Sequence, residues 1–110
     1  MLYGERYQQF FDSILGLLRG DNFSQEVFES ALKIKDNFIY TGAEACHQME
    51  NIFNESQDDA EKEFFAGEVK RILTKIDILK SPKKVTSYEV IQAFRYIAAA
   101  KQAIDMTKPI

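Results

Sequence analysis

The sequence is poor in the residues that build metal and redox sites and in those that build loops. It has one cysteine, Cys46, and one histidine, His47, in 110 residues. A single cysteine forms no disulfide within the chain, so the fold does not depend on an oxidising compartment. Only two prolines and five glycines are present, which leaves little material for long irregular segments. We therefore expect a chain built mainly of regular structure.

Long hydrophobic runs are also missing. A membrane-spanning helix needs roughly 18 consecutive apolar residues, and no stretch approaches that length. The first 18 residues lack a basic leader, and Asp12 interrupts their apolar run, so they do not resemble a signal peptide. These features predict a cytoplasmic or otherwise intracellular protein, while export by a non-classical route stays open. The length predicts one helical domain over 1–110, either alone or as a module of a larger protein.

Apolar residues recur with the 3.6-residue period of an α-helix along nearly the whole chain. The predicted fold is all-α, an antiparallel four-helix bundle, with helices over 3–19, 24–54, 58–80 and 87–107. Ser56 or Asp58 is expected to cap the third helix, and Pro82 to follow its end. Thr86 and Glu89 have the spacing of a capping box at the start of the fourth. Either an up-and-down order or one steeply crossing helix fits the pattern.

The second predicted helix has an internal ambiguity at Thr41 and Gly42. Thr41 and Glu44 could form a capping box there, which would divide 24–54 into two helices. The apolar stripe keeps the same phase on both sides of Gly42, however, which favours one helix of about 30 residues and roughly 45 Å.

Glu44 and His47 have the Glu-x-x-His spacing that helical bundles use in metal sites. On a helical wheel, Cys46 lies with the apolar residues, whereas His47 and Glu44 point away from them. Neighbouring side chains diverge by about 100° on a helix, so Cys46 and His47 do not converge on one ion. We therefore predict no metal site, no cofactor and a buried, unreactive Cys46.

An exposed histidine in mid-helix resembles the phosphoacceptor of histidine phosphotransfer domains, which are four-helix bundles of about this size. Met49 matches the apolar residue two positions after the histidine in that family's His-x-Leu-Lys-Gly motif. The lysine and glycine of the motif are replaced by Glu50 and Asn51. A glutamate there repels the phosphoryl group that the lysine would stabilise. Phosphotransfer through His47 is therefore a secondary hypothesis.

Charge is distributed unevenly, although the formal net charge is only −3. Residues 1–69 carry most of the 17 acidic side chains, and residues 70–110 carry most of the 14 basic ones. One group of basic residues forms a candidate site for an anion, a phosphoinositide or an acidic protein: Lys70, Arg71, Lys75, Lys80, Lys83 and Lys84. Its lysines also complement the helix dipole, and no aromatic residues interleave it in the loop, which argues against nucleic acid.

The last predicted helix has a second row of residues at helix-packing spacing, beside its core-facing row: Ala93, Tyr96, Ala100 and Ala103. Small residues allow a close approach of another helix, and tyrosine is common at interfaces. The row could receive a protein partner or a second copy of the chain, or it could pack inside the bundle against the long helix. No catalytic arrangement is found. The sequence as a whole favours a non-enzymatic protein–protein interaction domain.

Overall fold

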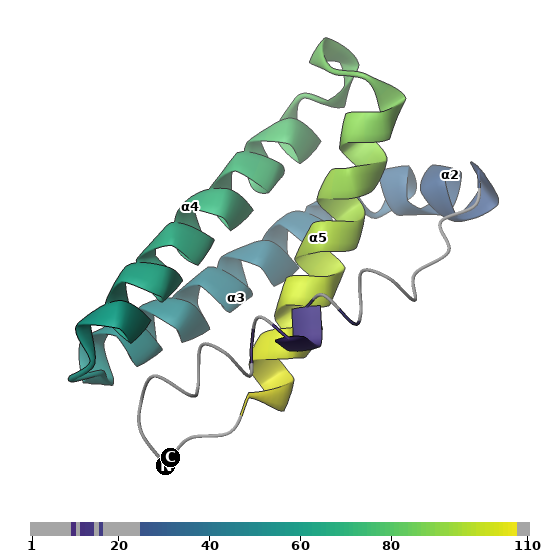
Figure 1. Ribbon diagram of the computed structural model, residues 1–110. Helices are drawn as coiled ribbons and strands as arrows, with labels where there is room; N and C mark the ends of the chain where they lie inside the picture. The colour runs from purple at the N-terminus through teal and green to yellow at the C-terminus, as the bar shows by residue number, and fades with distance from the viewer. Residues whose placement is uncertain (1–9, 11, 15, 17–24, 108–110) are drawn as a thin grey trace.

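The computed structural model describes residues 25–107, together with Phe10, residues 12–14 and Gly16. The described part is all-α and contains α2 (Gln25–Lys33), α3 (Lys35–Glu55), α4 (Asp59–Lys80) and α5 (Ser87–Met106). A short 3₁₀ helix, η1 (Pro82–Lys84), lies between α4 and α5. The three long helices α3, α4 and α5 pack together. α3 and α4 run side by side as an antiparallel pair, and α5 crosses this pair obliquely (Figure 1).

The hydrophobic core lies where these three helices meet. Phe65, Ile72, Phe94 and Ile97 are inaccessible to solvent, and Met49 joins them from α3. Burial of each large apolar side chain contributes about 1.5–3 kcal/mol to folding, so this cluster is the main source of stability. No helix of the described residues is long and apolar enough to cross a membrane.

α4 and α5 each begin at a residue that the sequence offered as a cap. The Asp58 carboxylate accepts a 3.0 Å hydrogen bond from the backbone N–H of Glu61, and Thr86 Oγ1 accepts one of 3.2 Å from that of Glu89. Each satisfies a backbone donor that has no partner within the helix. Pro82 follows the end of α4 closely. The predictions of helices over 58–80 and 87–107 are thus confirmed within one residue at each end.

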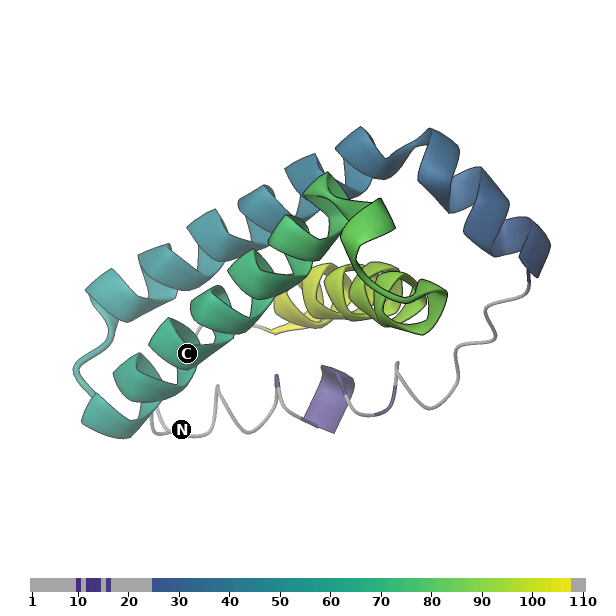
Figure 2. The same ribbon diagram turned by 90° about the horizontal axis from the view of Figure 1, so that it is seen from above.

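The predicted helix over 24–54 is not one helix, because it breaks at Ile34. Ile34 has φ −116° and ψ 28°, and its N–H bonds the carbonyl of Ala31 in a tight turn at 3.1 Å. A straight helix of 30 residues would extend past α4 and α5, which are shorter. The break instead turns α2 away from the axis of α3 (Figures 1 and 2), and Ala31 on α2 is buried. The helical pattern of the sequence is therefore continuous where the helix itself is interrupted.

The helix does continue through Gly42, as the phase of the stripe predicted. Thr41 Oγ1 donates a 2.8 Å hydrogen bond to the Asn37 carbonyl, so Thr41 bonds back into the helix and caps nothing. A Cβ on Gly42 would lie 3.0 Å from the Cγ1 and Cδ1 atoms of Ile76. Gly42 is therefore the position that lets α3 and α4 approach closely.

Most of the predicted helix over 3–19 lies outside the described residues. Phe10 and Ile14, which are described, are helical and buried. The Phe10 ring meets the rings of Phe64 and Phe65 on α4 edge-on, at centroid distances of 5.9 and 5.6 Å. This part of the chain therefore contributes side chains to the α4 side of the core.

Candidate functional site

A buried carboxylate on α4 links α4 to α5. Glu68 is 4% exposed, and its two oxygens bind different donors. The Tyr96 hydroxyl on α5 donates a 2.7 Å hydrogen bond to Oε2, and Arg71 Nε donates one of 2.6 Å to Oε1. Burial and then the negative charge of Glu68 raise the pKa of Tyr96, so this hydroxyl keeps its proton. The arrangement is a structural clamp between two helices.

The row of small residues on α5 lies inside the fold. Ala93, Ala100 and Ala103 are all 0% exposed, and α5 packs against both α3 and α4. Tyr96, the fourth member, is half-buried and directs its hydroxyl to Glu68. The placement agrees with the internal-packing interpretation of this row. A partner helix could reach the three alanines only after α5 had moved.

The six basic residues of the predicted anion site fall into two groups. Arg71 is paired with Glu68, and the Lys75 ammonium lies 5.6 Å from the centre of the Tyr96 ring. Lys80 is nine residues further along α4 than Arg71, about 13 Å along the helix axis. Lys70, Arg71 and Lys75 therefore do not share one site with Lys80, Lys83 and Lys84.

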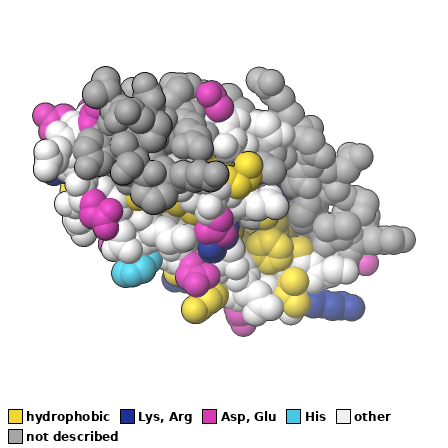
Figure 3. Space-filling model, turned by 90° about the horizontal axis from the view of Figure 1, so that it is seen from below, with side chains coloured by type: hydrophobic (Ala, Val, Ile, Leu, Met, Phe, Trp, Pro, Cys, Tyr) yellow, Lys and Arg dark blue, Asp and Glu magenta, His cyan; other side chains and the backbone are white. Residues whose placement is uncertain are grey.

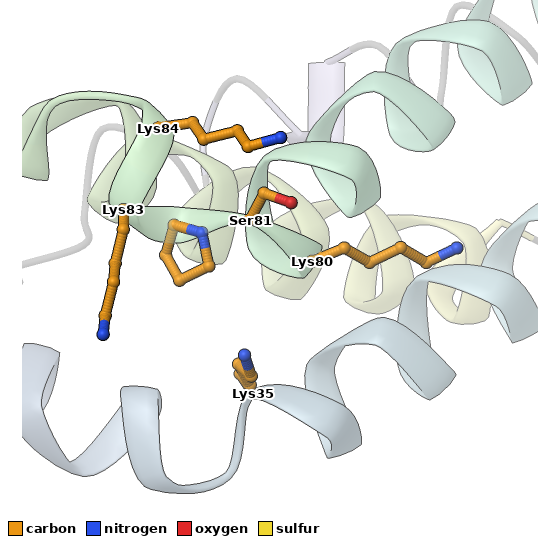
Figure 4. Close-up of a pocket in the computed structure, with 6 residues that line it drawn as sticks. Lys35, Lys80, Ser81, Lys83 and Lys84 are labelled. Atoms are coloured by element: carbon orange, nitrogen blue, oxygen red, sulfur yellow. The ribbon is translucent and has the colours of Figure 1, made fainter.

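The second group surrounds an open cavity of about 310 Å³ at the end of α4. Lys80, Lys83 and Lys84 line it together with Lys35, which the antiparallel pairing brings from the start of α3. Lys35 and Lys83 extend toward the opening from opposite sides, whereas Lys80 and Lys84 extend to one side of it (Figure 4). No carboxylate lines this cavity, which we call the lysine pocket. Within the described residues, none of the four ammonium groups forms an ion pair.

A second cavity, of about 230 Å³, lies in the seam between α3 and α4. It is lined by apolar side chains, with a carboxylate on the α3 edge and an ammonium group on the α4 edge: Phe53, Phe65, Ala66 and Val69, with Glu50 and Lys70. We call it the α3–α4 groove. Phe53 is 37% exposed, and Leu73, one turn beyond Val69, is 48% exposed. Both side chains are large and apolar but partly exposed, so these two positions lie at the edge of the core.

Cys46 and His47 diverge as the helical wheel predicted. Cys46 is buried, with its sulfur 3.9 Å from the Val69 carbonyl oxygen, and burial, then the charge of Glu50, raises the pKa of its thiol to about 11. His47 is exposed, and acidic side chains occupy the same region of the surface (Figure 3). In the part of the chain that the structure describes, no three histidine, cysteine or acidic residues are placed to hold a metal ion.

Two residues of these sites, Glu68 and Lys35, and the buried carboxylate of Glu61 were not predicted from the sequence. Glu61 and Glu68 are both buried, and their spacing from Phe65 (four residues before, three after) places them on the same stripe as Ile72. That spacing could have revealed them. Lys35 had no such signal, since its partners lie in the sequence beyond residue 79, and only the antiparallel pairing of α3 with α4 brings them together.

Comparison with protein-family models, with curated protein sequences and with solved structures gave no significant match. The two surface sites, the α3–α4 groove and the lysine pocket, are therefore the features that can indicate a function.

Proposed function

We propose that this protein is a non-enzymatic protein–protein interaction module, and that its α3–α4 groove binds a second copy of the same chain. The observation that supports this proposal is an apolar cavity on the surface of the α3–α4 pair, bordered by a negative and a positive side chain. Phe53 and Leu73 leave a large apolar area in contact with water. Covering such a surface is favourable at about 25 cal/mol for each Å² removed from water.

The charges on the two edges support a second copy as the occupant. A two-fold axis lying along the groove, between the two copies, would place α3 of one copy over α4 of the other. Glu50 would then face Lys70 of the second copy, and the same pair would occur twice by symmetry. An axis across the groove would instead place α3 over α3 and Glu50 over Glu50, which is repulsive. Charge complementarity thus favours one of the two symmetric arrangements.

The contact would extend beyond the groove itself. A stable interface buries about 800 Å² on each subunit, more than one cavity supplies. Leu73 on α4 and Ala43 on α3 continue the same seam, and both are exposed. Phe53 is the expected anchor because it is aromatic, partly exposed and part of a cavity wall. The neighbouring Lys62 ammonium lies over the Phe53 ring, 5.3 Å from its centre.

Solution mass tests this proposal. Multi-angle light scattering over a concentration series should show a monomer–dimer equilibrium for the wild-type chain. Phe53→Glu should shift it to monomer, because a carboxylate in the groove opposes burial. Tyr88→Glu is the matched control, since Tyr88 is also a surface aromatic, 70% exposed and at the start of α5. A monomer at every concentration, or a dimer that Phe53→Glu leaves intact, would overturn the proposal.

A second part of the proposal concerns the architecture of the domain. We propose that residues 3–19 form the fourth helix of an antiparallel four-helix bundle within a single domain, 1–110. The burial of Phe10 and Ile14 and the ring contacts of Phe10 with α4 support this arrangement. In it, the first helix would pack on α4 and α5.

Phosphotransfer through His47 gains no support, because the histidine is flanked on the exposed face of α3 by Glu44 and Glu50.

A further inference from the structure

We infer that the lysine pocket is a binding site for a ligand that carries two or more phosphate groups. The inference is independent of the α3–α4 groove, because the two cavities share no residue. The site differs from the basic segment that the sequence indicated: it lacks Lys70, Arg71 and Lys75 and gains Lys35.

The positive charge of the lysine pocket is not balanced by acidic residues in its lining. Four ammonium groups border one cavity of about 310 Å³, and its two other lining residues, Ser81 and Pro82, are uncharged. Elsewhere on α4 and α5, Arg71 is paired with Glu68 and Lys101 with Asp105, and the ammonium groups of Lys62 and Lys75 lie over aromatic rings. Unpaired like charges at one place repel one another, and an anion bound between them would relieve this repulsion.

Helix stability does not explain the position of Lys35. A lysine in the last turn of a helix favours the helix dipole, and this accounts for Lys80. Lys35 stands in the first turn of α3, where the dipole disfavours a cation. Its position adds positive potential at the place where α3 begins beside the end of α4. The arrangement is therefore costly for the helix and useful for an anion.

The side chains of the pocket indicate the type of anion that it binds. Lysine presents a compact, strongly hydrated point charge on a flexible stem, suited to phosphate oxygens, whereas arginine suits planar bidentate contacts. The cavity is open, and Lys35 and Lys83 extend toward it from opposite sides (Figure 4). Because lysine side chains are flexible, an anion bound between Lys35 and Lys83 would be within the pocket that both residues line. A polyphosphate or a phosphoinositide headgroup has this chemistry.

Two-dimensional amide NMR with sodium pyrophosphate as the probe tests the site. The expected shifts are confined to Lys35, Lys80, Ser81, Lys83 and Lys84, since Pro82, the sixth lining residue, has no amide hydrogen. The double variant Lys35→Gln plus Lys83→Gln should weaken binding about tenfold, since each lost ammonium group removes part of the attraction. The matched control, Lys75→Gln plus Lys101→Gln, changes the net charge equally at two lysines that line neither the pocket nor the α3–α4 groove, and it should bind as the wild type does. Added salt should weaken the wild-type interaction.

Vesicles distinguish the source of the phosphate. Phosphatidylcholine vesicles with and without a phosphoinositide are sedimented with the wild type and both double variants. Pyrophosphate shifts without vesicle binding would identify a soluble phosphate ligand. Vesicle binding that requires the phosphoinositide and is lost in Lys35→Gln plus Lys83→Gln would identify a headgroup. The inference is overturned if pyrophosphate causes no shift in the pocket, or if the control variant loses as much binding as the pocket variant.

Discussion

The Tyr96 hydroxyl lies 2.7 Å from Oε2 of Glu68 and joins the middle of α5 to the middle of α4. The glutamate is almost completely buried, and its other oxygen is held by Arg71. A buried carboxylate is costly unless its oxygens are hydrogen-bonded. The two hydrogen bonds therefore satisfy the buried carboxylate, and the one from Tyr96 ties α5 to α4 beside the apolar core.

Removing the Tyr96 hydroxyl should destabilise the fold. Tyr96→Phe leaves one oxygen of Glu68 without its donor, and we expect the free energy of unfolding to fall by about 1–3 kcal/mol. Tyr88→Phe removes the same atom from an exposed ring and should change it by less than about 0.5 kcal/mol. Urea unfolding of both variants measures the difference. Equal effects would mean that the clamp contributes nothing.

Two helical glycines should respond oppositely to the same substitution. Alanine at Gly67 would come nearest to the half-exposed guanidinium of Arg71, at 3.3 Å from its Nη2 atom, so Gly67→Ala should stabilise the protein by about 0.5–1 kcal/mol through helix propensity. Alanine at Gly42 would press on Ile76 at 3.0 Å, and overpacking costs about 1–3 kcal/mol. Gly42→Ala should therefore be neutral or destabilising. Thermal unfolding compares the two, and a clear gain for Gly42→Ala would contradict the close packing of α3 on α4.

The Cys46 thiol should be nearly inert in the folded protein. Burial and Glu50 raise its pKa from 9.0 to about 11, and the reactive species is the thiolate. Labelling by a disulfide reagent at pH 8 should be at least about 100-fold slower than in urea, since two pKa units alone reduce the thiolate fraction by this factor. Rapid labelling of the folded protein would show that Cys46 is accessible.

The same thiol gives a pH dependence of known sign. The folded state holds the proton more tightly than the unfolded state, because the pKa is raised on folding. The stability that this proton linkage contributes is therefore fully present below pH 9.0 and is lost as the pH rises toward about 11. Comparing the wild type with Cys46→Ala across this range isolates the effect. The stability of the wild type should fall more steeply than that of the variant, and parallel curves would contradict the shift.

Local signals predicted the parts of the fold that local interactions determine. Thr86 was predicted as a cap, and Asp58 as one of two candidates with Ser56, because such hydrogen bonds reach only three residues. The phase of the stripe predicted the continuous helix at Gly42 and the burial of Cys46. The break at Ile34 could not be predicted in this way, since no proline, glycine or side-chain cap marks it in the sequence. The lysine pocket likewise depends on Lys35 meeting residues from the far end of α4.

The central claim is that the α3–α4 groove joins two copies with Glu50 opposite Lys70. Mixing two charge variants tests it most directly. In Glu50→Lys both positions are basic, and in Lys70→Glu both are acidic, so each variant alone should repel its own copy and remain a monomer. Together they restore an opposite-charge pair at both symmetric contacts. Light scattering of the equimolar mixture should therefore give the mass of a heterodimer. A mixture in which both chains stay monomeric, or single variants that dimerise as well as the wild type, would contradict the arrangement.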